Sequence, residues 1–402
     1  MVVPTQIAAH MTPGQALARL KSIEPSRGNP YLYEYLRWKY EGEPIFERGG
    51  FTFPVTAYPT SRSQQSDPES ALIRPISEGF PPDDELLKDP LMRELVQRAG
   101  KPAQNLPTFA MQELLVGERV QMRCQMGTYF DMIDTCDALE WEILRAASSL
   151  KTASMRAYKL FDKRLPLRSR LHAQVSNPVR SGACRSLAIS LNALVAFYQD
   201  DDVYLMLRKR SEQVAVHAGL IHVIPSFMFQ PATPAIGHEF SLRHNIYREY
   251  LEELFDRPDP KQGESDPEYF TRDPLLLELS HMLETGQAEW YYTGVAVNLL
   301  NLRPDICTLL LIKDDSWYRR HTDLTVPEDQ RFQLNVEFAP HFQEAESPVA
   351  LVGNIPLKPT DRELAEHVSI EPRTMTPCGA FAFWAGVDLL RTLPEIWERI
   401  AR

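Results

Sequence analysis

The sequence predicts an α+β protein with a mixed sheet in its C-terminal half, preceded by a helical, proline-rich N-terminal region. Apolar runs of strand length alternate with helix signals between residues 187 and 312, which is typical of a sheet covered by helices. The early part of the chain is instead broken by many of the 32 prolines. Because 402 residues suffice for two domains, we expect an N-terminal region over 1–160 and a sheet domain over 161–402.

Composition limits the classes of partner. Lys+Arg 43 against Asp+Glu 54 gives a net charge of −11, which argues against broad binding to nucleic acid or anionic membranes, although a local basic groove is still compatible with it. The five cysteines are scattered without a C-x-x-C pair, so we expect reduced thiols rather than a disulfide frame or zinc site. With no signal peptide and no long apolar run, we expect a cytoplasmic protein without a membrane span.

The N-terminal region has four predicted parts. Thr12 is a candidate N-cap for a short helix over 14–23, since Pro13 follows it at the first helical position. The aromatic stretch 29–44 is expected to be a packing arm against another domain, a protein partner or the second copy of a homodimer. We expect an extended surface segment or mobile loop over 54–83, rich in Pro, Ser, Asp and Gln, and then a helix over 84–99.

The middle of the chain predicts a strand pair followed by a helix, within residues 106–147. Thr135 and Asp137 are candidate helix caps. The segment 165–186 is basic, and it would either hold an anionic ligand or neutralise acidic neighbours. Its basic side chains and its histidine are Arg168, Arg170, His172, Arg180 and Arg185.

The C-terminal half supplies most of the predicted sheet. A buried strand over 187–197, apolar on both faces, leads through a turn at 199–202 into a returning strand over 203–207. His222 lies in a following apolar run and is expected to be a core residue. Further along the chain we expect a helix over 274–285, two apolar strands within 286–314 and an amphipathic C-terminal helix within 378–402.

A helix with clustered acids follows the first three strands. Glu249, Glu252 and Glu253 are spaced i, i+3 and i+4, so a helix places all three carboxylates on one face, next to Arg248. Such a cluster is either a solvated surface or a site where a cation or basic group sits among the acids.

The hexapeptide Arg248-Glu249-Tyr250-Leu251-Glu252-Glu253 resembles the core of the Nudix box, and the strand, hairpin and Pro225 ahead of it resemble the approach to that box. The resemblance implies a Nudix-like α/β/α sandwich. The sequence departs from the pattern at several positions. The two glycines expected after Pro225 are Ser226 and Phe227, and the loop to Arg248 is about seven residues longer. The box glycine and glutamate are replaced by Pro234 and Phe240, with Glu239 one position out of step, and the glycine expected after the helix is Phe255.

The resemblance implies a metal-dependent hydrolase acting on a nucleoside diphosphate linked to another group. Mg²⁺ or Mn²⁺ would be held by Glu249, Glu252 and Glu253, since hard cations take oxygen ligands. Catalysis would use Glu252, Glu253 and the distant Glu337, with Arg248 orienting a ligating carboxylate. Substrate-binding candidates are Arg208, Lys209, Arg210, Phe227 and Phe229.

The alternative is a catalytically inactive Nudix-like sensor or protein-interaction module with a regulatory role, in which the acids are salt-bridged rather than bound to metal. A DNA-binding regulator is disfavoured, since the sequence lacks a helix-turn-helix signal with a basic recognition helix. Geometry discriminates the first two. Glutamates converging on an open cleft favour the hydrolase, whereas Phe227 and Phe240 filling that cleft favour the binding module.

Overall fold

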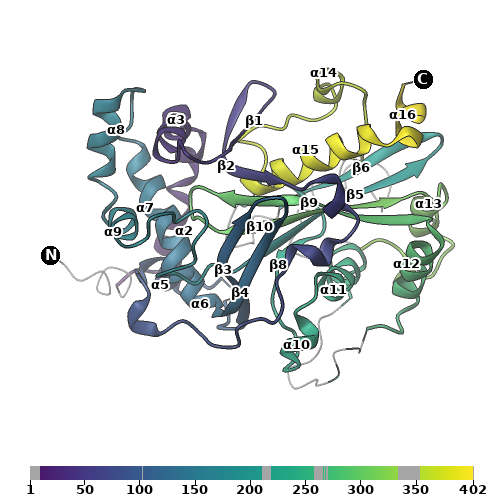
Figure 1. Ribbon diagram of the computed structural model, residues 1–402, viewed down its shortest axis with the longest axis horizontal. Coiled ribbons are helices and arrows are strands. Elements are labelled where there is room, and N and C mark those ends of the chain that lie inside the picture. Colours follow the sequence, from purple (N-terminus) through teal and green to yellow (C-terminus); the bar gives the residue numbers. More distant parts are fainter. Residues whose placement is uncertain are drawn as a thin grey trace. The chain divides into compact units, whose positions relative to one another are not determined.

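The computed structural model describes residues 10–101, 103–210, 219–257, 266, 268, 270–333 and 354–401. The protein is a mixed α+β chain with a curled mixed sheet and surrounding helices (Figure 1). It divides into two compact units that alternate along the sequence. The first unit contains 1–58, 72–189 and 296–305, and the second contains 59–71, 190–295 and 306–402. The predicted domain boundary after residue 160 stays a prediction.

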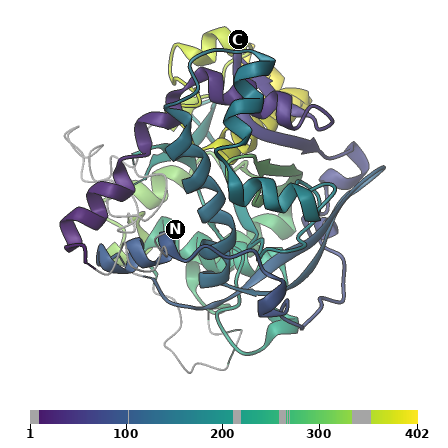
Figure 2. The same cartoon turned by 90° about the vertical axis from the view of Figure 1, so that its left-hand side faces the viewer.

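The first unit combines two antiparallel hairpins, β1–β2 and β3–β4, with a group of helices (Figure 2). In the longer hairpin, Pro107 pairs with Thr128 at one end and Val116 with Val120 at the other. The elements of this unit are α2 (Pro13–Lys21), η1 (Glu24–Gly28), α3 (Pro30–Lys39), β1 (Ile45–Arg48), β2 (Phe51–Pro59), η3 (Asp83–Glu85), α5 (Leu91–Arg98), β3 (Pro107–Val116), β4 (Val120–Thr128), α6 (Tyr129–Met132), η4 (Ile133–Asp137), α7 (Ala138–Ala147), α8 (Met155–Asp162) and α9 (Pro166–Gln174).

The second unit is organised around strands in the order β9-β10-β5-β6-β11, with β7 paired to β6 and β8 paired to β5. Strand β6 is antiparallel to β5, to β7 and to β11. Its elements are α4 (Arg62–Gln65), η2 (Pro68–Ala71), β5 (Ser190–Gln199), β6 (Asp202–Lys209), β7 (Ile221–Val223), β8 (Ser226–Met228), α10 (Ile236–Glu239), α11 (Leu242–Phe255), α12 (Pro274–Thr285), β9 (Ala288–Asn298), β10 (Pro304–Ile312), α13 (Trp317–Thr322), η5 (Glu328–Gln330), β11 (Asn354–Pro356), α14 (Asp361–Ala365), α15 (Pro377–Thr392) and α16 (Pro394–Ile400).

Successive side chains of a strand point to opposite faces of the sheet. Because the side chains of β5 are apolar on both faces, helices cover the strand on both sides. Val195 and Phe197 join a hydrophobic cluster with Leu254 of α11 and Trp317 of α13. The preceding residue, Leu194, lies on the opposite face and contacts α15, where a side chain in place of Gly386 would collide with it. The sheet core therefore fixes α11 on one side of β5 and α15 on the other (Figure 1).

Several predicted elements are confirmed. The first helix has Thr12 as its N-cap and Pro13 at its start, and the strand pair within 106–147 is the hairpin β3–β4. The turn after β5 uses Asp200 and Asp201, both at positive φ, which this tight connection requires. The helix over 274–285 and the two strands within 286–314 are also present as α12, β9 and β10.

Other predictions are wrong. The segment 54–83 is not purely an extended surface, because it begins inside β2, whose residues 53–58 are buried. The helix expected from residue 84 begins only at Leu91, after Pro90. The C-terminal helix is interrupted at Leu393 and Pro394, and α15 is buried around most of its circumference instead of being amphipathic.

Asp137 occupies the N-cap position of α7 but makes no capping hydrogen bond with its side chain, and Thr135 is not a cap of any described helix, which corrects a further prediction. Both are buried within a π-helical turn between α6 and α7. The Thr135 hydroxyl donates to the Asp131 carbonyl at 2.6 Å. Burial raises the pKa of Asp137 to about 7, despite the opposing effect of Arg303.

Because the pKa of Asp137 is raised, the folded state favours the protonated carboxyl. The contribution of Asp137 to the free energy of unfolding is therefore present in acid and is lost as the pH rises through about 7. We expect Asp137→Asn to stabilise the protein at pH 8 relative to wild type, with a gain about 2 kcal/mol larger than at pH 5. Urea denaturation at both pH values measures this difference. The exposed Asp84→Asn is the control, and an equal effect of Asp137→Asn at both pH values would contradict the assignment.

Within the described part of the chain, no helix combines the length and apolar character needed to cross a membrane.

Candidate functional site

Helix α11 carries the acidic motif, and its position is set by its ends and its apolar side. Ser241 caps the helix by accepting the His244 backbone N–H at 3.3 Å, and Asp256 ends it in a left-handed conformation. Tyr250, Leu251 and Leu254 pack into the core cluster under β5. The remaining side of the helix therefore carries the arginine and glutamates of the motif.

Arg248 and Glu249 form a buried ion pair. A guanidinium nitrogen of Arg248 lies 2.8 Å from Glu249 Oε1, and the two side chains are only 3% and 8% exposed. A second Arg248 hydrogen bond, at 3.3 Å, reaches the side-chain oxygen of Asn245 one turn earlier. Arg248 thus holds the Glu249 carboxylate in place, and its role in orienting a metal ligand stays a prediction.

Glu253 is bound to the loop that follows β7. Its two carboxylate oxygens accept the backbone N–H of Ser226 at 3.2 and 3.0 Å, and the residue is 4% exposed. The Ser226 hydroxyl lies 2.9 Å from Asn192 Oδ1 and 3.1 Å from His222 Nε2. Glu253 therefore joins α11 to strands β5, β7 and β8 through a buried polar network.

His222 belongs to this network and is buried, as expected for a core histidine. Its Nδ1 lies 3.1 Å from the Val223 carbonyl, so this nitrogen carries the proton and donates. His222 therefore supports the loop at Ser226 from the β7 side.

The three glutamates of the motif differ in environment. Glu249 and Glu253 are buried, whereas Glu252 between them is partly exposed. Among the residues that the structure describes, the three do not bring ligand oxygens into one group close enough to share a cation. The predicted Mg²⁺ or Mn²⁺ centre at this helix stays a prediction. Glu337, the predicted distant catalytic residue, lies outside the described residues.

Arg208, one of the predicted substrate-binding residues, is held inside the protein. It is almost fully buried, and its Nη1 donates to the Glu253 backbone carbonyl at 3.0 Å. Burial lowers the pKa of Arg208 to about 9, although the nearby Glu253 carboxylate favours its charged form. Lys209 and Arg210, the next two residues, are partly exposed and are better placed to meet a ligand.

The aromatic residues predicted to line a pocket are buried. Phe227 is 9% exposed, while Phe229 and Phe240 are essentially inaccessible and have ring centroids 5.7 Å apart. Ring packing of this kind fills space that a ligand would need. The predicted substrate-binding role of Phe227 and Phe229 stays a prediction, as does the choice between hydrolase and binding module.

Three arginines of the basic segment 165–186 have structural contacts. Arg180 pairs with Glu43 at 2.8 Å, and Arg185 donates to the carbonyls of Pro178 and Ser181 at 2.6 Å each. Arg168 is also completely buried. Of the two alternatives, neutralisation of acidic neighbours fits Arg180, and backbone bonding describes Arg168 and Arg185.

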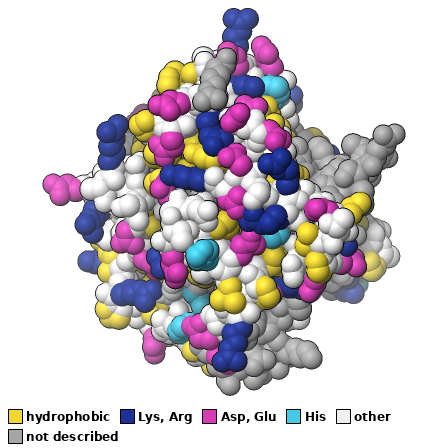
Figure 3. All heavy atoms as spheres, turned by 90° about the vertical axis from the view of Figure 1, so that its right-hand side faces the viewer, with side chains coloured by type: hydrophobic (Ala, Val, Ile, Leu, Met, Phe, Trp, Pro, Cys, Tyr) yellow, Lys and Arg dark blue, Asp and Glu magenta, His cyan; other side chains and the backbone are white. Residues whose placement is uncertain are grey.

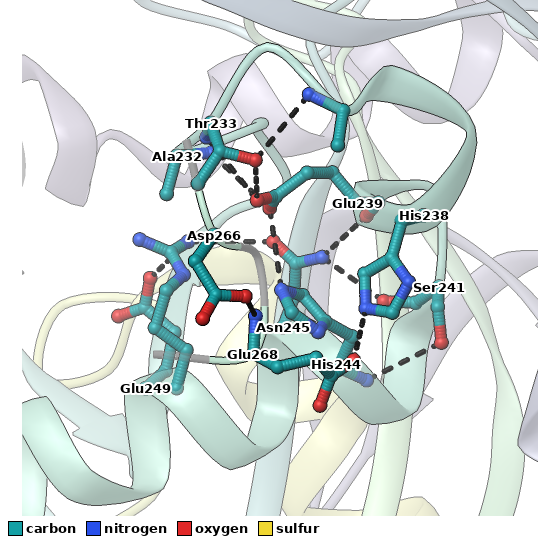
Figure 4. Close-up of polar contacts among 12 residues, drawn as sticks. Ala232, Thr233, His238, Glu239, Ser241, His244, Asn245, Glu249, Asp266 and Glu268 are labelled. Atoms are coloured by element: carbon teal, nitrogen blue, oxygen red, sulfur yellow. Dashed lines mark hydrogen bonds and ion pairs between the residues drawn. The ribbon is translucent and has the colours of Figure 1, made fainter. Parts of the chain in front are cut away.

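Sequence reasoning missed a second polar group at the start of α11. His238, His244 and Glu268 bring ligand atoms within 4.8 Å of one another, and the buried Glu239 lies beside them (Figure 4). Two histidines six residues apart across a helix N-cap were the available signal. Glu268 could not be linked to them, because it lies 24 residues beyond His244 in the sequence.

The surface drawn in Figure 3 interleaves basic and acidic side chains rather than separating them into large areas of one sign. This agrees with the modest net charge of −11. A mixed surface of this kind provides little long-range attraction for a polyanion.

No family model matches the chain, and no curated protein matches its sequence.

Proposed function

We propose that this chain is a Nudix-like binding module that recognises a nucleotide-like ligand without hydrolysing it. Support for the Nudix-like part comes from the motif on α11, from the strands and Pro225 that precede it, and from helices covering both faces of β5. Support for binding without hydrolysis comes from the burial and hydrogen bonding of the motif glutamates.

The observation that carries the proposal is the attachment of Glu253 to Ser226. Both of its carboxylate oxygens already accept a backbone N–H, in a buried position. A Mg²⁺ or Mn²⁺ ion needs carboxylate oxygens that face an accessible site. Freeing Glu253 for a cation would leave the buried Ser226 N–H without its acceptor, at a cost of about 1–3 kcal/mol.

The residues that replace the two loop glycines explain why the Glu253 carboxylate binds a backbone N–H. Ser226 and Phe227 occupy the positions after Pro225, and Phe227 is buried beside β5, with Leu191 as its pairing partner. The loop is therefore strand β8, hydrogen-bonded to the sheet, rather than a glycine turn that lets a ligand approach the backbone. In the proposed module, Glu253 stabilises this strand against α11.

Lys209 and Arg210 are the candidates for contact with an anionic ligand. Lys209 ends β6 opposite Ile221, and the backbone N–H of Arg210 continues this pairing by donating to the Leu220 carbonyl at 2.9 Å. Both side chains are partly exposed, unlike the neighbouring Arg208. Phosphate groups bind best to such charged donors.

The test is calorimetric binding of a panel of nucleoside diphosphate derivatives to the full chain, with magnesium and with a chelator. We expect at least one derivative to bind in both conditions and to be recovered intact. Lys209→Gln and Arg210→Gln should each weaken binding about tenfold, because a charge-assisted hydrogen bond is worth about 1.5 kcal/mol. The exposed Lys163→Gln is the matched control. Absence of binding across the panel would overturn the proposal.

A further inference from the structure

We propose that His238, His244 and Glu268 form a binding site for a divalent transition metal, with zinc the best fit. This site uses none of the glutamates of the α11 motif and does not depend on the function proposed above. It consists of two imidazoles and one carboxylate whose ligand atoms lie within 4.8 Å of one another. Small side-chain rotations bring such atoms to the roughly 2.0–2.2 Å bond lengths of a zinc centre.

Two of the ligands are already in contact. His238 Nε2 lies 2.6 Å from Glu268 Oε1, and the rings of His238 and His244 meet edge to face with centroids 4.8 Å apart. His238 belongs to α10, and His244 lies in the first turn of α11. The short connection between these helices therefore places both imidazoles beside the carboxylate (Figure 4).

The connection itself is held firmly. The Asn245 side-chain amide donates to the backbone carbonyls of Glu239 and Ser241, at 2.7 and 3.0 Å. The Ser241 hydroxyl donates to Glu69 at 2.8 Å, and the same carboxylate oxygen accepts the Arg243 N–H at 2.7 Å. The angle between α10 and α11, and with it the relative position of the two histidines, is thus set without a metal.

Glu239 supplies the feature that separates this group from an ordinary surface ion pair. It is completely buried, and it accepts hydrogen bonds from Ala232 N, Thr233 N and the Thr233 hydroxyl at 3.2, 3.1 and 2.6 Å. Glu239 is therefore a fixed anion behind the site.

His244 is oriented by this anion. Its Nε2 lies 3.4 Å from Glu239 Oε2, an ion-pair distance, and a proton on Nε2 would leave Nδ1 as the nitrogen with a lone pair. The ring of Phe270 packs on His244 at a centroid distance of 4.9 Å and restricts its rotation. Metal-binding histidines commonly have such a carboxylate behind them, which fixes the tautomer and increases ligand basicity.

The donor set indicates which metal fits. Two neutral imidazoles and a carboxylate suit zinc and its neighbours in the first transition row, whereas magnesium prefers oxygen ligands. His244 is buried, but the side chains of His238 and Glu268 are 42% and 49% exposed. An ion could therefore enter from solvent and keep a water molecule as its fourth ligand.

The experiment is calorimetric titration of the full chain with zinc and, separately, with magnesium, after removal of carried-over metal by a chelator. We expect one zinc ion per chain and no comparable magnesium binding. His238→Gln and Glu268→Gln should weaken zinc affinity more than the roughly 10- to 100-fold expected for loss of an outer-shell partner. Glu239→Gln should weaken it within that 10- to 100-fold range.

Matched controls are His281→Gln and Glu284→Gln, which alter an exposed histidine and an exposed glutamate on α12. Cobalt absorption spectra provide a second readout, because a tetrahedral site gives intense visible bands. Circular dichroism checks that each variant is folded. Wild-type protein without stoichiometric zinc binding, or variants at 238 and 268 that bind like the controls, would overturn the proposal.

Discussion

Replacing Glu253 with alanine is expected to lower the free energy of unfolding by about 3 kcal/mol or more. The substitution removes the acceptor for a buried backbone N–H of Ser226 and leaves the buried Arg208 without its nearby carboxylate. Removing one member of a buried charged pair typically costs about 3–5 kcal/mol, because the other member stays desolvated. Urea denaturation followed by circular dichroism measures the effect.

The matched variant is Glu252→Ala, which removes the partly exposed glutamate from the adjacent position. We expect it to cost about 1 kcal/mol or less, as is usual for exposed charged groups. If the two variants are equally stable and Glu253→Ala loses only a metal-dependent activity, Glu253 is a catalytic residue and its structural assignment is wrong.

Arg168→Met is the second substitution with a large expected effect, of about 3 kcal/mol on the stability of the first unit. The fully buried Arg168 guanidinium donates to the Tyr40 hydroxyl at 2.6 Å, to the Leu299 carbonyl at 3.1 Å and to the Leu300 carbonyl. Methionine fills part of the volume but leaves these buried oxygens without their donor. The loss is expected in both thermal and urea unfolding.

Arg170→Met tests whether charge alone is responsible, because Arg170 lies on the same helix and is exposed. We expect a change within about 0.5 kcal/mol for this variant. An anion-binding role for Arg168 would give the opposite pattern, with little loss of stability and a loss of phosphate or sulfate binding.

The helix that carries the site could be predicted because its signals are local. Ser241, the apolar positions and the acidic spacing all lie within a single stretch of sequence, and α11 has the expected place between two groups of strands. The hairpin β3–β4 and α12 were predictable for the same reason. Turn residues and apolar runs are read over a few positions, and tertiary contacts reinforced them here.

The use of the glutamates could not be predicted, because it depends on distant partners. Glu253 meets Ser226, which is 27 positions away, and Asn192 and His222 complete that network from other strands. The burial of α15 around most of its circumference likewise follows from its neighbours, including Leu194 of β5. Sequence spacing gives the face of a helix but not the group that will cover it.

The candidate metal site illustrates the same limit. Two of the proposed ligands, His238 and His244, are close in the sequence, as is Glu239 behind them. The third ligand, Glu268, comes close to them only in the folded chain. Glu239 itself looked like a motif glutamate displaced by one position, whereas the structure gives it a buried role behind His244.

The most direct test of the central claim is metal-dependent turnover of a ligand that is known to be bound. The panel derivatives that bind are incubated at saturation with magnesium or manganese, and product is measured for wild type, Glu252→Gln and Glu253→Gln. The proposed binding module predicts intact ligand in all three proteins. Turnover by wild type that disappears in both variants would contradict it and establish a metal-dependent hydrolase at helix α11.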